Sequence, residues 1–238
     1  MKIKKLLAKI IRVTDISPTA KEVCLSLPEP IDFVAGSFVN VFMEINGEKI
    51  RRAYSISSSP KNQKEITLTI RLSPDGVMTP IFWKKDMVGE TFEIMGPLGL
   101  NTVDKMRSRK IYLFAFGVGA GVVKSITHHF LDRNASDEER VESLVIGTGS
   151  RSVYEILYRE YFDGLAKRQN NISVLHVVSD SANEAGLPTG FIQDHIEHFD
   201  FNNSDVYVCG QEQACNDLVK KINSINPGTC NFFIEGFH

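Results

Sequence analysis

The hydrophobic pattern of this chain changes its period once, near residues 101–109, and this change constrains the fold more than any other feature. Up to about Leu100, short stretches of alternating apolar and β-branched residues are separated by proline, glycine and asparagine turns, which is typical of antiparallel strands. After Arg109, continuous apolar runs alternate with helix-compatible segments, which indicates a parallel sheet covered by helices. We therefore expect two domains, residues 1–104 and 105–238.

The same pattern predicts individual elements. In the first half it predicts a six-stranded antiparallel β-barrel and one short helix, with strands at residues 10–16, 22–27, 37–45, 51–56, 65–72 and 91–95 and the helix at 79–85. In the second half it predicts an α/β domain with a parallel sheet, with strands at residues 111–116, 143–149, 172–179, 205–210 and 231–237 and helices at 122–133, 154–168, 190–199 and 214–224.

Composition excludes several classes of protein. The formal net charge of −2 and the pI near 6.3 remove the phosphate attraction on which nucleic-acid binders rely, so we expect no nucleic-acid partner. No apolar stretch approaches the ~20 residues that span a bilayer, and Lys9 and Arg12 interrupt the apolar N-terminal run, so it does not fit a signal peptide.

The four cysteines also bear on compartment and cofactors. They are too few for a disulfide-held exported domain, which fits a reducing cytoplasm. They also lack the close spacing that ligates an iron–sulfur cluster, and the histidines have no metal-ligand spacing, so we expect neither centre in this chain.

The string Arg52-Ala53-Tyr54-Ser55 at the end of an expected strand is the most informative one. Alternate side chains of a strand share a face, so Arg52 and Tyr54 lie together while Ser55 takes the other face or turns at the strand end. An arginine can bind a pyrophosphate, an aromatic ring can stack on a flavin, and a hydroxyl can hydrogen-bond a ring nitrogen. Alone, the string fits a serine-rich turn with a surface arginine equally well.

Three further strings occur with it: Phe33-Val34-Ala35-Gly36-Ser37-Phe38, Gly76-Val77-Met78-Thr79 and Gly96-Pro97-Leu98-Gly99. In this order and with Arg52–Ser55, they resemble the flavin motifs of the ferredoxin-NADP⁺ reductase superfamily, although Ser37 replaces the usual glutamine. The resemblance implies bound FAD rather than FMN. It assigns Arg52 to the pyrophosphate, Tyr54 to the isoalloxazine ring and Ser55 to flavin N5. Ala53 belongs to the same strand, and Gly76, Val77, Met78 and Thr79 would meet the diphosphate at a helix N-terminus.

The second half carries a matching series for a nicotinamide dinucleotide. Gly117-Val118-Gly119 lies between an expected buried strand and a helix, where glycines let a pyrophosphate approach backbone N–H groups. It resembles the family's glycine motif, but Gly121 and Val122 stand where threonine and proline are usual. These departures fit altered packing and altered nucleotide use equally well.

Two more segments extend this resemblance. Gly149-Ser150-Arg151 is similar to the segment that meets the adenosine half of NAD(P), and Arg151 could pair with the 2′-phosphate of NADPH or simply cap a loop. Cys209-Gly210 is similar to the strand end that borders the nicotinamide, although a cysteine here is also a common core residue.

The end of the chain is similar to a terminal segment of bacterial reductases that returns toward the flavin. This similarity of Glu235-Gly236-Phe237 implies that Phe237 binds the cofactor. It also implies a catalytic role for Glu235, which would relay protons or gate access to the flavin. Ser55 and Cys209 are the other two residues to which the resemblance assigns a catalytic role.

The resemblance implies an FAD-dependent NAD(P)H oxidoreductase of the cytoplasm. It would take a hydride from NADPH or NADH, with NADPH favoured through Arg151, and pass electrons to a separate ferredoxin, flavodoxin or oxygenase component. One alternative is an NAD(P)H:flavin reductase that uses diffusible flavin as a substrate. Another is a non-catalytic flavin-binding electron-transfer or regulatory subunit.

Overall fold

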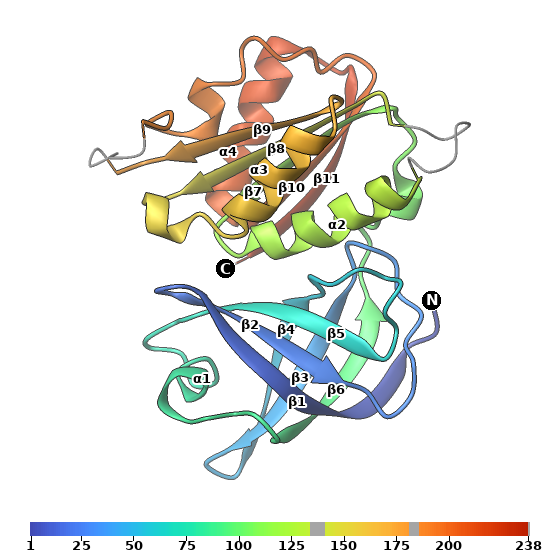
Figure 1. Ribbon diagram of the computed structural model, residues 1–238, viewed down its shortest axis with the longest axis vertical. Helices are drawn as coiled ribbons and strands as arrows, with labels where there is room; N and C mark the ends of the chain where they lie inside the picture. Colours follow the sequence, from blue (N-terminus) through green and yellow to red (C-terminus); the bar gives the residue numbers. More distant parts are fainter. Residues whose placement is uncertain (134–140, 181–185, 238) are drawn as a thin grey trace. The chain divides into compact units, whose positions relative to one another are not determined.

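Two sheets of different type organise the chain, and each belongs to its own compact unit (Figure 1). The computed structural model describes residues 1–133, 141–180 and 186–237. The first unit comprises Met1–Val103 with Lys124–His129, and the second comprises Asp104–Val123 with Phe130–His238. Among the helices of the described residues, none is long and apolar enough to cross a membrane.

The first sheet is antiparallel and curled, with strand order β4-β3-β6-β1-β2-β5, and it confirms the six-stranded N-terminal prediction. A single bridge between Ile56 and Leu68 connects its two outermost strands. The elements are β1 Lys4–Ser17, β2 Ala20–Ser26, β3 Phe38–Ile45, β4 Glu48–Ser55, β5 Glu65–Arg71, α1 Ile81–Lys84, β6 Thr91–Leu98 and the 3₁₀ turn η1 Val103–Lys105.

Alternation of side chains explains why this sheet curls around a core. In β1, Leu6, Ala8 and Ile10 are buried while Leu7 and Lys9 between them are exposed, as expected for a strand with one face toward the core. Buried residues of five of these strands form one cluster together with Phe82 of the short helix α1, and the half-buried Ile50 and Tyr54 of β4 pack against it. The alternation of buried and exposed residues therefore determines which face of β1 is turned toward the core.

The second sheet is parallel, with strand order β11-β10-β7-β8-β9, which confirms the predicted α/β architecture. Its elements are β7 Lys110–Phe116, α2 Gly119–Arg133, β8 Ser143–Ser150, η3 Val153–Glu155, α3 Arg159–Arg168, β9 Ile172–Val178, η4 Ile192–Asp194, β10 Ser204–Gln211, α4 Glu212–Ile225 and β11 Cys230–Phe237. Figure 1 shows α4 on one side of the sheet and α2 and α3 on the other.

Two of the helices expected in the second half of the chain differ from the structure. The segment 154–168 is helical only from Arg159, because Tyr158 adopts a left-handed conformation (φ 57°) after the buried Ile156 and Leu157. The segment 190–199 forms only the short turn η4. The Asp194 carboxylate caps the start of this turn by accepting a hydrogen bond from the Phe191 N–H at 2.9 Å. The turn ends at His195, whose backbone (φ −122°, ψ 10°) leaves the helical region.

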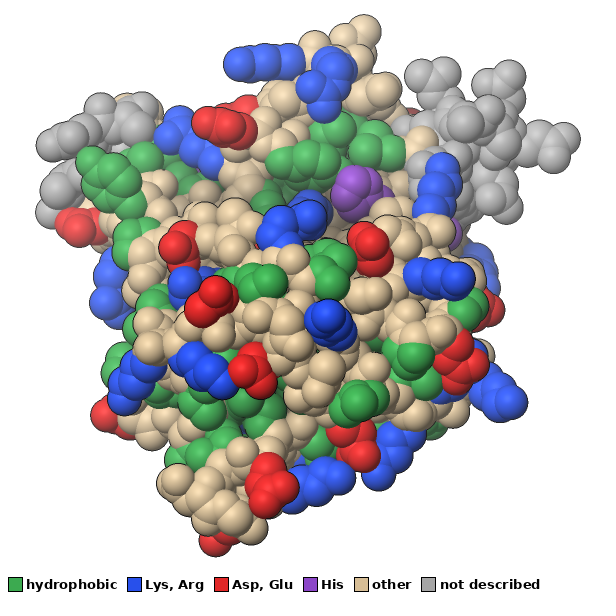
Figure 2. All heavy atoms as spheres, turned by 60° about the horizontal axis from the view of Figure 1, so that its bottom comes forward, with side chains coloured by type: hydrophobic (Ala, Val, Ile, Leu, Met, Phe, Trp, Pro, Cys, Tyr) green, Lys and Arg blue, Asp and Glu red, His purple; other side chains and the backbone are tan. Residues whose placement is uncertain are grey.

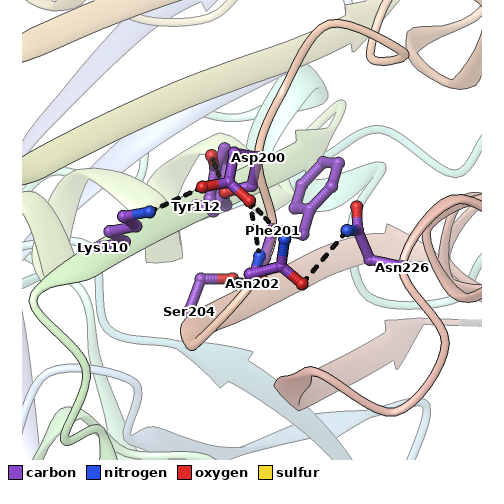
Figure 3. Close-up of polar contacts among 7 residues, drawn as sticks. All are labelled: Lys110, Tyr112, Asp200, Phe201, Asn202, Ser204 and Asn226. Atoms are coloured by element: carbon purple, nitrogen blue, oxygen red, sulfur yellow. Dashed lines mark hydrogen bonds and ion pairs between the residues drawn. The ribbon is translucent and has the colours of Figure 1, made fainter.

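The amino ends of β7 and β10 are held by polar side chains. Lys110 donates to the Asp200 carboxylate at 2.7 Å, and the Tyr112 hydroxyl donates to the Asp200 carbonyl oxygen at 2.8 Å (Figure 3). The Lys110 hydrogen bond lowers the pKa of Asp200, with help from the backbone and side-chain amides of Asn202.

On the face drawn in Figure 2, basic, acidic and hydrophobic side chains are interspersed.

Asp205 makes the most deeply buried of these polar contacts, with a side chain that is 0% exposed. One carboxylate oxygen accepts hydrogen bonds from the backbone N–H groups of Arg107 at 2.5 Å and Ser108 at 2.7 Å. The other accepts one from the Asn231 amide at 2.9 Å. Asp205 thus ties the segment before β7 to β10 and β11.

We predict that Asp205→Ala lowers the free energy of unfolding by about 2–4 kcal/mol, because three hydrogen-bond donors lose their buried charged acceptor. Urea unfolding followed by circular dichroism measures the loss. Asp200→Ala removes a carboxylate from the same end of the sheet at an exposed position, so it should be less harmful. Equal losses for the two variants would contradict the assigned role of Asp205.

Candidate functional site

The candidate flavin strand, β4, is an outermost strand of the first sheet, paired with β3 along its whole length. By alternation, Ile50, Arg52 and Tyr54 share a face. Ile50 and Tyr54 pack against the core, yet Arg52 between them is exposed. The Arg52 guanidinium donates to the Arg51 carbonyl oxygen at 2.8 Å. The guanidinium of Arg52, on this outermost strand, is therefore accessible to a ligand.

Beyond β4 the chain leaves β3 and joins β5. The Ile56 N–H still donates to the Ser37 carbonyl oxygen, whereas the Ser57 N–H donates to the Thr67 carbonyl oxygen, at 2.9 and 2.8 Å. Ser55, the last residue of β4, lies half-buried just before this transition, opposite Phe38. Within the serine-rich string, the chain thus changes its hydrogen-bonding partner from β3 to β5.

The loop Gly76–Thr79 meets this strand through one side chain. The Tyr54 hydroxyl contacts the buried Met78 sulfur at 3.5 Å, while Val77 is exposed. Burial raises the pKa of Tyr54 to about 12, against the lowering effect of Arg52, so the phenol keeps its proton. The Thr79 hydroxyl accepts from the Ser73 N–H at 3.0 Å and so closes the loop on itself.

These residues fit an FAD. Arg52 offers a solvent-accessible guanidinium for phosphate, and Tyr54 offers a neutral aromatic ring anchored by burial next to it. Helix α1, at four residues, is shorter than the helix expected after Thr79. Backbone groups of the Gly76–Thr79 loop, rather than the end of a long helix, are thus what this segment can offer to a diphosphate.

In the second unit the candidate residues gather at the carboxyl ends of parallel strands. Strand β7 lies between β8 and β10, and the chain proceeds from it first toward β9 and later toward β11. Ligands of open α/β sheets bind at such a topological switch point. Gly117, Val118 and Gly119 connect β7 to α2, and Cys209 and Gly210 end β10 beside them.

Glycine is required at this switch point by close backbone contacts. A Cβ on Gly119 would lie 2.2 Å from the Cys209 carbonyl oxygen, and one on Gly210 would lie 2.5 Å from the Phe116 carbonyl oxygen. Gly117 has a left-handed φ of 56° with no atom within 4 Å of its Cβ position, so its turn faces open space. The start of the 15-residue helix α2 at this turn fits a pyrophosphate. Val122, at one of the atypical positions, is a buried core residue.

Cys209 and Glu235 are neighbours across the sheet. They are register partners in β10 and β11. Burial, followed by the charge of Glu235, raises the pKa of Cys209 well above its ordinary value, so the thiol remains protonated. The fully buried Tyr207 donates its hydroxyl to the Glu235 carboxylate at 2.6 Å. This phenol holds the carboxylate, and it is a contact that the sequence motif did not indicate.

Ser150 and Arg151 lie on the other side of β7, at the end of β8. The Ser150 hydroxyl donates to the Glu155 carbonyl oxygen at 3.2 Å, and Arg151 is exposed. The predicted residues therefore form two groups: Arg52, Ala53, Tyr54, Ser55 and Gly76–Thr79 belong to the first unit, and the remaining ones belong to the second.

Sequence reasoning also missed a hollow. An open hollow of about 450 Å³ lies where β10 and β11 end and α4 begins, and it is lined by Gln211, Glu212, Gln213, Asn216 and Phe237. Of these only Phe237 was expected to bind a cofactor. The available signal was the pair Gln211-Glu212, which directly follows Cys209-Gly210 in the sequence and places polar side chains at the strand end.

Both units match domain families of known sequence. Residues 7–102 match the oxidoreductase FAD-binding domain family, and residues 113–220 match the oxidoreductase NAD-binding domain family. The reductase component of phenol 2-monooxygenase from Pseudomonas sp. (strain CF600) is 30% identical over 95% of this chain and 64% of that protein. Ferredoxin–NADP reductase B from Sorangium cellulosum is 25% identical over 79% of this chain and 76% of that protein.

The chain spans 46–64% of the length of the first curated relatives that it matches. One of these is the glycine betaine monooxygenase reductase subunit of Pseudomonas aeruginosa, 29% identical over 73% of this chain and 46% of its own length.

Solved structures show the same fold. A cytochrome P450 reductase from Amycolatopsis superposes with a TM-score of 0.85 at 23% identity, covering 99% of this chain and 71% of that one. A ferredoxin NADP⁺ reductase from Neisseria gonorrhoeae with bound FAD and NADP gives 0.82 at 18% identity and covers both chains fully, at 100%. With an FAD-binding domain followed by an NAD-binding domain, the chain belongs to the ferredoxin-NADP⁺ reductase superfamily.

Proposed function

We propose that this protein is an FAD-dependent NAD(P)H oxidoreductase that passes electrons to a separate protein acceptor. The observation that carries the proposal is the presence of an FAD-binding and an NAD-binding domain in one chain, at residues 7–102 and 113–220. A bound flavin would supply the two-electron and one-electron chemistry. The protein residues would bind, align and shield the reactants.

In the first unit, Arg52 holds the FAD pyrophosphate and Tyr54 supports the ring system. Exposure of Arg52 beside a core-packed aromatic supports these roles. Ser55 lies at the strand end, where its hydroxyl would orient flavin N5. Gly76–Thr79 contributes loop backbone next to Tyr54, since Met78 of this loop contacts the Tyr54 hydroxyl.

In the second unit, Gly117–Gly119 receives the dinucleotide pyrophosphate, and Cys209, Gly210 and Phe237 line the nicotinamide pocket. The raised pKa of Cys209 keeps an uncharged thiol next to an uncharged reduced ring. Glu235, held by Tyr207 at 2.6 Å, is the candidate for relaying protons or gating access.

The acceptor is proposed from the relatives. Their names describe reductase components of phenol and glycine betaine monooxygenases, an aromatic O-demethylase and a ferredoxin–NADP reductase. We infer that the acceptor is an oxygenase component or a small redox protein such as a ferredoxin or flavodoxin.

The function is tested with FAD-loaded protein freed of unbound flavin by gel filtration. Cytochrome c reduction is then measured with NADH or NADPH, with and without added free FAD. We expect turnover that follows the bound flavin content and does not need free flavin. Turnover only after free flavin is added would identify a reductase of diffusible flavin instead. No turnover at full FAD occupancy would identify a non-catalytic flavin-binding subunit.

For the flavin site we predict that Arg52→Ala weakens FAD binding by about 10- to 150-fold, the loss expected for one charge-assisted phosphate contact of roughly 1.5–3 kcal/mol. Arg51→Ala is the matched control, because Arg51 is an exposed neighbour on the opposite face of β4. The dissociation constant is measured by quenching of FAD fluorescence. Equal weakening by both substitutions would show that only general charge is involved.

A further inference from the structure

A buried polar relay joins three elements of the second unit. Thr148 of β8 and His176 of β9 are register partners, and both residues are buried, at 2% and 5% exposure. The Thr148 Oγ1 lies 2.6 Å from His176 Nδ1, and His176 Nε2 lies 3.1 Å from the Asp163 carboxylate of α3. The relay therefore runs from one strand to the next and on to the helix.

The contacts of the His176 ring determine where its hydrogen lies. A carboxylate only accepts hydrogen bonds, so Nε2 carries the hydrogen and donates it to Asp163. Burial lowers the pKa of His176, against the raising effect of Asp163, so the ring is uncharged at neutral pH. Nδ1 then accepts from the Thr148 hydroxyl. Both ring nitrogens are thus committed, and the hydrogen bonds of the relay run in one direction, from Thr148 to Asp163.

The relay lies directly before the carboxyl end of β8. The residue after Thr148, Gly149, accepts a hydrogen bond from the Gly117 N–H of the glycine turn at 3.3 Å. A Cβ on Gly149 would lie 2.8 Å from the Phe116 ring, so the strand end is closely packed against the end of β7. The chain then continues into Ser150-Arg151. The position of β8 at Thr148 therefore influences both the glycine turn and this segment.

We propose that His176 is a positioning residue for the nicotinamide dinucleotide, which holds the carboxyl end of β8 by way of Thr148 and anchors it to α3 by way of Asp163. The inference rests on the proposed function, in which Gly117–Gly119 receives the dinucleotide pyrophosphate. His176 acts through the backbone of β8 and contacts no reactant. Because the relay acts on the strand and not on the ribose 2′ position, its loss weakens the binding of NADH and NADPH by the same factor.

Stopped-flow reduction of the FAD-loaded protein tests this inference, because it separates the dissociation constant of the nucleotide from the rate of flavin reduction at saturation. His176→Leu should raise the dissociation constants of NADH and NADPH by about 2- to 30-fold, the range for residues that act on a site through a packed network. The saturating rate should change by less than about twofold, since the relay is not in contact with the reacting atoms.

Thr148→Val covers the case in which His176→Leu does not fold, because it replaces only the hydroxyl by a methyl group. It should raise both dissociation constants in the same way, whereas Thr148→Ser, which keeps the hydroxyl, should bind both nucleotides as the unmodified protein does. In the His176→Leu background, Thr148→Val should add little, because the hydrogen bond between the two residues is already lost.

Ser204→Ala is the matched control. Ser204 is a buried residue at the amino end of β10 in the same sheet, and its hydroxyl donates to the Phe201 carbonyl oxygen at 2.7 Å. This variant should leave both dissociation constants unchanged.

Equal weakening by Ser204→Ala and Thr148→Val would overturn the inference, because it would reduce the relay to general stabilisation of the sheet. Unchanged dissociation constants in the folded relay variants, or a lower saturating rate alone, would also overturn it, and all these results would leave the proposed function intact. A bound flavin that neither nucleotide reduces in the unmodified protein would instead overturn the proposed function, and the inference with it.

Discussion

The contact on which the second unit depends is the approach of the α2 start to the end of β10. A Cβ at Gly119 would lie 2.2 Å from the Cys209 carbonyl oxygen, so only glycine lets the two backbones meet there. Because no side chain fills this space, the ends of β7 and β10 and the N-terminus of α2 converge. Cys209, Gly210 and, one strand further, Glu235 take their positions from this convergence.

Electrostatics differ between the two candidate sites in a way that suits their ligands. The first unit exposes a cation, Arg52, at an open sheet edge, next to a phenol that burial keeps neutral. The second keeps a neutral thiol at Cys209 because burial and the carboxylate of Glu235 oppose its ionisation. A phosphate-rich cofactor matches the first arrangement, and an uncharged nicotinamide ring matches the second.

Much of the fold could be predicted from the sequence because its periods are strong. The alternation in β1 and the apolar run of β7 each specify one kind of strand. The segment 190–199 was misassigned because the backbone leaves the helical region at His195, directly after Asp194, and periodicity does not register where a helix stops. The neighbours Tyr207 and Glu235 lie on different strands. Strand order and register bring them together, and a single sequence contains neither.

The proposed activity is the transfer of a hydride from a nicotinamide nucleotide to an FAD that this chain binds. Anaerobic stopped-flow mixing of the FAD-loaded protein with a slight excess of NADH, followed at the flavin absorbance band, tests it most directly, because no electron acceptor is needed. We expect complete, saturable bleaching of the bound flavin by a stoichiometric amount of nucleotide. A bound flavin that stays oxidised with both NADH and NADPH would contradict it.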